Sequence, residues 1–537
     1  MRASDRSRVV DRETMLQKLI EIGIALSAER NHQRLMERIL LEAMKFSRAD
    51  GGTLYLRGED DRLSFALMRT ESLGVALGGT TGRAPTAEPL ALYHGGRENH
   101  RNVATHAALS GDTVNIVDAY VSEEFDFSGT RSFDAQNGYR SISFLTIPLK
   151  NSQAHVIGVL QLINALDARG RPGPFDPGTI PLIEALASQA AIALDNRLLL
   201  DAQRQLMEAF IRVIAKAIDA ESPYTGAHCQ RVPLITEMIV EAAIADREGP
   251  FATFTMTEEE RYELHIAAWL HDCGKVTTPE YVVDKATKLE TIYDRIETVR
   301  TRFEVLKRDV EIARLRGEID QAEQDRRLAA LDEERRFLER MNLGQERVPD
   351  AEIAKLRPIA ERRWRDWAGQ ERSFLSADEL DNLSIARGTL LTHERDVIRD
   401  HIVATIDMLG QLPFPKDLKR VPEYAGGHHE RMDGKGYPRG LVASEMSVPA
   451  RMMAIADVFE ALTAPDRPYK KAKRLSEALA IMKQMSETGH LDPELFALFV
   501  KAEIPQRYAR AFMAATLVDE EASAKVLAGE ALTTTAL

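Results

Sequence analysis

The pattern of hydrophobic and polar positions changes several times along this chain, and each change predicts a different element. Residues 13–48 carry apolar side chains at helical spacing, whereas the following "GGTLYLRGEDDRLSFALMRT" has short β-type runs broken by Gly and Asp. Residues 141–165 then contain two strand-like runs around a polar turn. A helix, a hairpin and further strands together predict an α+β domain over residues 13–200.

A long helix is predicted to follow this domain. No Gly or Pro occurs between Leu182 and Ser222, so a helix over about 180–220 runs unbroken into the next unit. Its apolar stripe suits packing against a second copy in a parallel homodimer, although packing within one domain would leave the same stripe. We favour the homodimer, in which the helix transmits rotation or register shifts.

The rest of the chain is predicted to be all-helical, because amphipathic segments punctuated by Gly and Pro continue without strand alternation. Residues 290–388 form a charged insertion in which apolar positions from Ile292 to Ala313 alternate steps of four and three, the spacing of a coiled-coil seam. Gly317 separates this run from a second charged helical stretch, which predicts an antiparallel helical hairpin. The predicted boundaries are a tail at 1–12, the α+β domain at 13–200, the connecting helix at 180–220, the helical domain at 205–510 with its insertion at 290–388, and a tail at 511–537.

Composition limits the classes of partner. With 70 basic and 83 acidic residues the net charge is −13, and no domain-sized stretch is strongly basic, so broad attraction to nucleic acid is not expected. Cys229 and Cys273 are too few for a disulfide framework, which favours a reducing compartment. No apolar run approaches the roughly 20 residues that span a bilayer. We therefore expect a soluble, cytoplasmic protein that binds neither nucleic acid nor membrane.

Several histidines stand in short motifs that suggest metal binding. They are His228 in "TGAHCQRV", His271 in "AAWLHDCGK", His401 in "RDHIVATIDML", and His428 and His429 in "GGHHERMDGKGYP". Asp457 stands in an otherwise apolar helical stretch, where a buried carboxylate has to be paired or metal-bound. Adjacent side chains on a helix diverge by about 100°, so His271 could bind one ion while Asp272 bridges to a second. Such ligands are compatible with Fe, Mn, Zn or Ni, and a pair of ions would clamp a phosphodiester.

These motifs resemble those of the HD-GYP domain, the bacterial branch of the HD phosphohydrolase superfamily that hydrolyses cyclic di-GMP. The resemblance covers about 205–288 and 389–510 and rests on "HDCGK", "HHERMDGKGYP" and "ADVFEALTAPDRPYKKA". It implies an all-α catalytic domain in which the insertion is an elaboration of this protein. The metal ligands that it implies are His228, His271, Asp272, His401, His428, His429 and Asp457. It also implies that Asp272 bridges the ions, that Lys275 acts at the scissile phosphate, and that Arg467 and Lys470 hold substrate phosphates.

The resemblance also bears on metal content and substrate. Members with a third metal carry a Glu four residues before the first histidine, where this chain has Tyr224, so two divalent ions, Fe or Mn, are implied. The implied activity is hydrolysis of cyclic di-GMP to pGpG, with further cleavage to GMP left open. One alternative is a weakly active module that binds a nucleotide or a partner such as a GGDEF cyclase. Another is a phosphodiesterase for a different cyclic dinucleotide such as cyclic GMP-AMP.

Residues 13–200 are similar to GAF domains, most clearly over 141–196. The cyclic-nucleotide-binding class of this family carries an Asn-Lys … Phe … Asp-Glu signature. Asn164 and Phe175 match it, whereas Ala165, Thr179 and Ile180 do not. The ligand of this domain therefore stays open, and we expect it to regulate the catalytic domain through the connecting helix.

Overall fold

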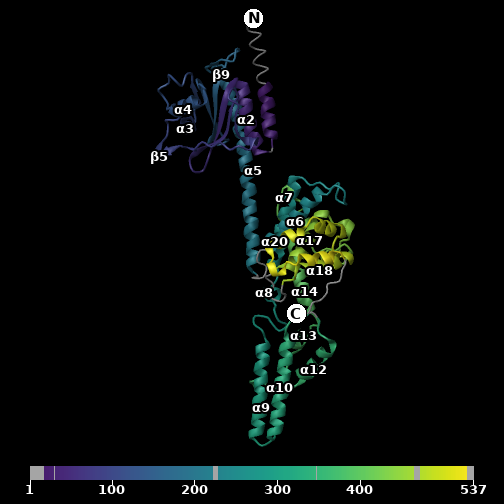
Figure 1. Ribbon diagram of the computed structural model, residues 1–537. Coiled ribbons are helices and arrows are strands. Elements are labelled where there is room, and N and C mark those ends of the chain that lie inside the picture. The colour runs from purple at the N-terminus through teal and green to yellow at the C-terminus, as the bar shows by residue number, and fades with distance from the viewer. Residues whose placement is uncertain (1–16, 30, 222–227, 346, 465–471, 529–537) are drawn as a thin grey trace. The chain divides into compact units, whose positions relative to one another are not determined.

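The computed structural model describes residues 17–29, 31–221, 228–345, 347–464 and 472–528 (Figure 1). The chain divides into two compact units, residues 1–206 and 207–537. None of the helices in the described ranges is both long and apolar enough to cross a membrane.

The first unit is built on an antiparallel sheet with the strand order β3-β2-β1-β9-β8-β7, to which β4 and β10 add short pairings. Its strands are β1 (Ala49–Arg57), β2 (Arg62–Thr70), β3 (Val75–Gly78), β4 (Leu90–Ala91), β7 (Val114–Ile116), β8 (Phe144–Lys150), β9 (Val156–Leu166) and β10 (Pro172–Gly173). A separate hairpin pairs β5 (Tyr93–His94) with β6 (Arg97–Glu98).

Helices cover both faces of this sheet. Successive side chains of a strand point to opposite faces, and β9 has buried apolar side chains on both of them. Leu160 and Leu162 of β9 pack with α2 (His32–Ser47) and with the first turns of α5 (Ile180–Glu221). Val159 lies in a second cluster with α3 (Val103–Ser110), and the short helix α4 (Ser128–Asn137) completes the unit.

Helix α5 contains the whole connecting segment without a break. Leu186 and Leu194 are buried in the core of the first unit, whereas Ile211 and Ile218 are buried in the core of the second. Part of the predicted stripe therefore packs within each unit, as the alternative interpretation allowed. Other apolar residues of α5, among them Leu206, remain exposed.

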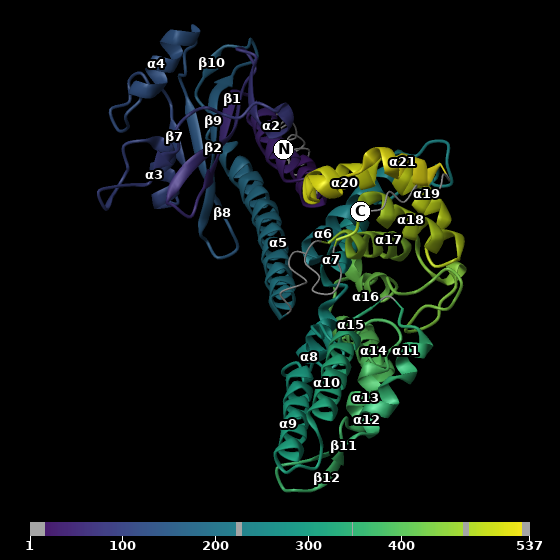
Figure 2. The same cartoon turned by 60° about the horizontal axis from the view of Figure 1, so that its bottom comes forward.

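The second unit has a helical core (Figure 2), in which α6 and α17 pack together through residues such as Val232 and Met453. Its helices are α6 (His228–Ala245), α7 (Glu258–Leu270), α8 (Glu280–Val283), α14 (Thr392–Arg399), α15 (His401–Gly410), α16 (Val421–Ala425), α17 (Val448–Thr463), α18 (Leu475–Glu487), α19 (Pro493–Lys501), α20 (Ile504–Phe512) and α21 (Glu520–Leu527). Because Asp519 accepts hydrogen bonds from the backbone N–H and hydroxyl of Ser476, α21 is held on α18. Folded structure thus extends into the segment predicted to be a tail.

The insertion forms a helical hairpin with a small core of its own. Its helices are α9 (Ile296–Leu315), α10 (Gln321–Asn342), α11 (Asp350–Ala354), α12 (Leu356–Glu361) and α13 (Ala377–Leu383), and β11 (Arg363–Arg365) pairs with β12 (Glu371–Ser373). Phe303 and Leu338 are buried between the two long helices. The seam prediction was wrong at Ile292, which is 98% exposed and precedes α9. The predicted fold class, an α+β unit followed by a helical unit with a hairpin insertion, is confirmed.

Candidate metal centre

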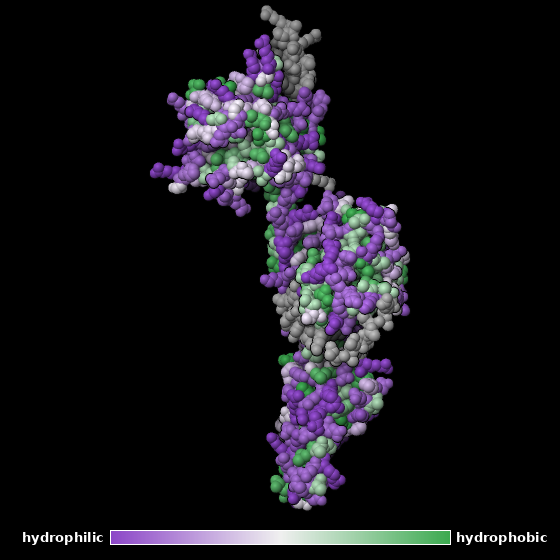
Figure 3. Space-filling view, in the orientation of Figure 1, coloured by the Kyte–Doolittle hydropathy of each residue, from purple (hydrophilic) through white to green (hydrophobic). Residues whose placement is uncertain are grey.

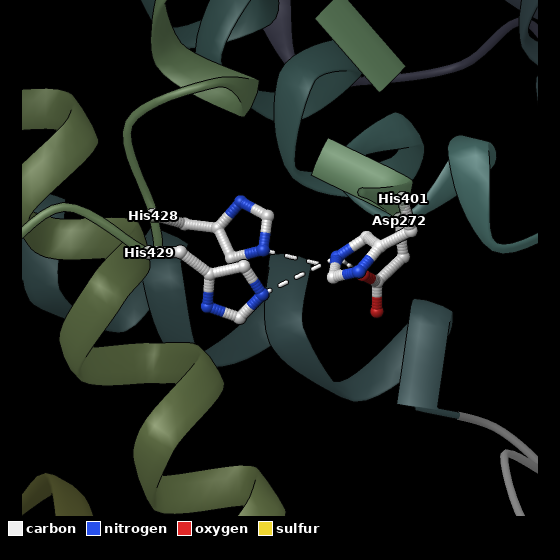
Figure 4. A group of neighbouring side chains, drawn as sticks. All are labelled: Asp272, His401, His428 and His429. Carbon is white, nitrogen blue, oxygen red and sulfur yellow. Dashed lines mark hydrogen bonds and ion pairs between the residues drawn. The ribbon is translucent and has the colours of Figure 1, made fainter. Parts of the chain in front are cut away.

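The seven residues predicted as metal ligands come together where several helices of the second unit begin or end. His228 is the first residue of α6, His271 follows the last residue of α7, and His401 is the first residue of α15. His428 and His429 follow α16, and Asp457 lies within α17. Helix ends from distant parts of the chain thus converge on one buried centre, four of whose side chains are drawn in Figure 4.

Asp272 occupies the middle of this centre. Its Oδ2 lies 3.1 Å from Nε2 of His228 and 3.2 Å from Nε2 of His271. Its Oδ1 lies 3.3 Å from Nε2 of His401 and 4.0 Å from Nε2 of His428 (Figure 4). The two oxygens of one carboxylate therefore face two different groups of imidazoles, as a bridging ligand requires.

The remaining members of the centre extend these two groups. Oδ1 of Asp457 lies 3.4 Å from Nε2 of His228 and 3.8 Å from Nε2 of His271. On the other side, Nε2 of His429 lies 3.3 Å from Nε2 of His401. The residues form two sets, and within each set the ligand atoms lie within 4.8 Å of one another. Asp272 belongs to both sets. One contains His228 and His271, and the other contains His401, His428 and His429.

The second ring nitrogen of four of these histidines has its own acceptor. For three of them, Nδ1 faces the backbone carbonyl three residues earlier in the chain. These pairs are His271 with Ala268, His401 with Ile398, and His428 with Ala425. An Nδ1–H that donates to a carbonyl leaves Nε2 unprotonated and directed inward, which is the usual arrangement of a metal-ligating histidine.

The fourth histidine, His228, directs Nδ1 at the buried carboxylate of Glu460, which sequence reasoning missed. Arg231 donates to the same carboxylate from Nε at 2.7 Å and lies 2.6 Å from it through Nη2. The argument that identified Asp457, an acidic residue in an apolar helical stretch, applied equally to Glu460 three positions later. A carboxylate behind the imidazole orients the ring and raises its basicity as a ligand.

Burial and neighbouring charges shift the pKa values of His228, His271 and Asp272. Burial opposes charge on His228 and His271, but the adjacent carboxylates outweigh it, raising the pKa of His228 well above its usual value and that of His271 to about 9. Burial also opposes charge on Asp272, yet Lys275 and His271 hold the pKa of that carboxyl well below its usual range. The imidazolium forms of the two histidines thus pair with carboxylates when protons occupy the centre, and a bound metal would displace those protons.

His428 and His429 are neutral at pH 7. Burial and the nearby His429 and His271 hold the pKa of His428 well below its ordinary value. Burial, together with His401, lowers the pKa of His429 to about 4. Both rings therefore offer lone pairs at pH 7, the form in which imidazole binds metal.

Two buried polar atoms of the centre indicate that its residues fit a metal ion. Nε2 of His428 and Oδ1 of Asp272 are buried and have no hydrogen-bond partner among the described residues. Unpaired buried polar atoms are costly, and a cation between them would satisfy both. Burial raises the pKa of Cys273 to about 11, which leaves it a thiol, so the donors are imidazole and carboxylate. The donor set fits divalent ions of the Fe, Mn or Zn type.

A cavity of about 430 Å³ opens beside the centre, lined by His429, Asp457 and Tyr437. Its wall also carries cationic side chains, namely Arg399, Arg431, Lys435 and Lys473. Lys275 lies within the centre, with Nζ 2.6 Å from Oδ2 of Asp272, and although burial disfavours its charge, Asp272 raises its pKa so that it is an ammonium. The predicted phosphate-binding residues Arg467 and Lys470, and Tyr224, lie outside the described residues.

Comparison with known families matches both units. Residues 31–194 match the family model of the GAF domain, and residues 377–495 match that of the HD domain. The second match contains His401, His428, His429 and Asp457, while His228 and His271 lie upstream of it.

Curated relatives include cyclic dinucleotide phosphodiesterases. The chain is 26% identical over 316 residues to 3'3'-cGAMP-specific phosphodiesterase 3 of Vibrio cholerae serotype O1, covering 59% of this chain and 41% of that protein. It is 48% identical over 81 residues to 3'3'-cGAMP-specific phosphodiesterase 1 of the same organism, covering 15% and 19%. It is 51% identical over 75 residues to a cyclic di-GMP phosphodiesterase of Pseudomonas aeruginosa, covering 14% and 17%. The chain thus spans less than half the length of each of these relatives.

Proposed function

We propose that this protein, in which a GAF domain precedes an HD domain, is a metal-dependent phosphodiesterase that hydrolyses cyclic di-GMP to pGpG. The observation that carries the proposal is the placement of Asp272, whose two oxygens face two groups of imidazoles beside a cavity with cationic walls. The names of the relatives support the substrate class.

Two divalent ions, Fe or Mn, are the proposed cofactors. His228, His271 and Asp457 form one group of ligands, His401, His428 and His429 form the other, and Asp272 belongs to both. When bound, such ions supply Lewis-acid activation of a phosphodiester at neutral pH. Most of these ligands are buried, and the outer hydrogen bonds of four histidines fix the direction of their rings.

Lys275 is the proposed catalytic cation. Its ammonium lies against Asp272, so it is placed to hydrogen-bond a non-bridging oxygen of the scissile phosphate or to give a proton to the leaving oxygen. The cations of the cavity wall supply the local positive charge that an anionic substrate needs in a chain of net charge −13.

The test is product analysis. Purified full-length protein is incubated with cyclic di-GMP, or with 3'3'-cGAMP, in the presence of Mn²⁺ or anaerobic Fe²⁺, and products are separated by chromatography. We expect cyclic di-GMP to be converted to pGpG, with no conversion by His271→Ala. Preferred turnover of 3'3'-cGAMP would favour the second candidate substrate, which the names of two relatives support. If the folded, metal-loaded protein leaves both nucleotides intact, the phosphodiesterase proposal is wrong and a binding module is favoured.

The number of ions has a separate test. Metal analysis of anaerobically purified protein is expected to find about two ions per chain, and three tightly bound ions would overturn that number. In Asp272→Ala, which removes the ligand common to both groups, both ions are expected to be lost.

We further propose that the protein is a parallel homodimer joined along α5 and that its GAF domain regulates catalysis through this helix. Ile192, Leu199, Leu206 and Val213 recur every seven residues and are 42, 60, 58 and 65% exposed. Hydrophobic side chains are visible along one edge of α5 in Figure 3. A seven-residue apolar repeat supplies one of the two apolar positions per heptad that form the seam of a two-stranded coiled coil. Because α5 also contributes buried residues to the cores of both units, movement of the helix would reach each core.

A further inference from the structure

Helix α14 follows the insertion, and its last residue is a cation that lines the cavity beside the metal centre. Arg399 is the last residue of α14 and lies two positions before His401. Its guanidinium carbon is 5.6 Å from the centre of the Tyr437 ring. Tyr437 in turn stacks on His429, with ring centres 4.8 Å apart and an angle of 25° between the planes. The guanidinium therefore lies one aromatic layer beyond a proposed metal ligand.

The contact with Tyr437 leaves N–H donors of this guanidinium available. A guanidinium carries five N–H donors, and a cation–π contact does not consume them. The ion pair of Arg399 with Asp396 spans 3.5 Å, and both side chains are more than half exposed, so it contributes little. A phosphate that approaches in the plane of the guanidinium can accept two parallel hydrogen bonds.

Arg431, another cation of the cavity wall, is already engaged. It forms a two-point pair with Asp433, at 3.0 Å from Nε and 2.7 Å from Nη2. Lys435 lies 3.8 Å from the same carboxylate, beyond hydrogen-bonding distance, and its side chain is 78% exposed. Arg399 thus offers more unused hydrogen-bonding capacity to a ligand than Arg431.

The start of α14 is held in place by a buried ion pair at the base of the insertion. Both oxygens of Glu394 accept hydrogen bonds from Nζ of Lys285, at 2.8 and 2.9 Å. The same ammonium donates to Oδ1 of Asn382 at 2.7 Å, and Thr389 donates to the backbone carbonyl of Lys285 at 2.9 Å. Because α14 is anchored, little conformational freedom of its backbone is lost when Arg399 binds a ligand.

We propose that Arg399 binds the phosphate of the cyclic dinucleotide that is not being cleaved. The inference rests on the proposed phosphodiesterase function. A cyclic dinucleotide carries its two phosphates on opposite sides of one ring, so one phosphate at the metal centre leaves the other displaced along the cavity. Arg399 then discriminates between a substrate with two phosphates and a single phosphodiester.

The test compares two substrates in Arg399→Gln. With cyclic di-GMP we expect KM to rise about 10- to 100-fold, because a pair of charge-assisted hydrogen bonds is lost. The kcat should stay within about twofold of the wild-type value. With bis(p-nitrophenyl) phosphate, which has a single phosphate, kcat/KM should not change. Arg395→Gln is the matched control, because Arg395 lies on the same helix, donates to the carbonyl of Arg387, and is not among the residues that line the cavity.

The outcomes separate this proposal from the one on which it rests. If the wild type hydrolyses cyclic di-GMP and Arg399→Gln has the same KM, the assignment of Arg399 is wrong. An equal loss on both substrates would also overturn it, since Arg399 would then act through Tyr437 on the centre. If the wild type does not hydrolyse cyclic di-GMP, the phosphodiesterase proposal fails, and calorimetric binding of that nucleotide to the metal-loaded protein decides the assignment. Binding weakened at least tenfold by Arg399→Gln supports it, while unchanged or undetectable binding overturns it.

Discussion

Replacing Glu460 by Gln removes the negative charge behind His228 while keeping the size and one acceptor of the side chain. Glu460 is buried, and although burial disfavours its charge, His228 and Arg231 lower its pKa to about 2, so the carboxylate is ionised at neutral pH. It accepts from Nδ1 of His228 and thereby keeps Nε2 available to a metal. A neutral amide would bind the ring more weakly and lower its basicity.

The expected magnitude follows from these contacts. Loss of a partner behind a ligating histidine typically lowers metal affinity by about 10- to 100-fold, which corresponds to about 1.4–2.8 kcal/mol. A second effect falls on stability, because Arg231 loses the charge of its partner and its side chain is only 14% exposed. Breaking a buried ion pair costs up to about 3–5 kcal/mol, so the metal-free variant should also melt earlier.

The assay measures metal affinity by competition with a chromogenic chelator, and unfolding of the metal-free protein by circular dichroism. Glu263→Gln is the matched control, because Glu263 is a buried carboxylate that pairs with Arg420, with 2.9 Å between Oε2 and Nε. Among the described residues, it forms no hydrogen bond or ion pair with the proposed ligands. It should lose stability but keep its metal affinity. A metal affinity for Glu460→Gln within about twofold of wild type, or no lower than that of the control, would refute the reasoning.

Three further predictions concern the bridge, the helix α5 and a buried lysine. Asp272→Asn should lose bound metal and lower turnover at least 100-fold, as measured by metal analysis and chromatography, and an active variant with full metal content would exclude the bridging role. Leu206→Asp should convert the dimer to a monomer in light scattering, whereas an unchanged mass would exclude the α5 seam. Lys288 is buried and donates to the carbonyls of Leu383 and Ile385, and burial lowers its pKa from 10.5 to about 8. Between these two pH values the folded state binds fewer protons than the unfolded state, so the free energy of unfolding rises with pH. From about pH 7.5 to about pH 9.5 it should rise by about 2 kcal/mol more in the wild type than in Lys288→Met, which lacks the titrating group. Equal pH dependence of denaturant unfolding in both proteins would contradict this.

Local pattern predicted the types of the main elements, although it missed the β11–β12 pair in the insertion, which was predicted to be helical. Two strand-like runs around a polar turn predicted the strands within residues 141–165, and the lack of Gly and Pro predicted the uninterrupted helix that the structure shows as α5. The seam prediction failed at Ile292 because a local hydrogen bond starts α9 later. Oδ1 of Asp294 accepts from the backbone N–H of Ile296 at 3.0 Å, and Asp294 also binds Asn342, so the chain before it is not helical.

The sequence by itself determined the kind of chemistry available, because histidines and acidic residues in spaced motifs limit the ligands to imidazole and carboxylate. It could not show that the oxygens of Asp272 face two separate groups, that Glu460 lies behind His228, or that the guanidinium of Arg399 lies over the ring of Tyr437. His228 and Glu460 are 232 positions apart. Helical periodicity determines which face a side chain occupies but not which distant helix end meets it, and packing of the helices in the second unit decides that.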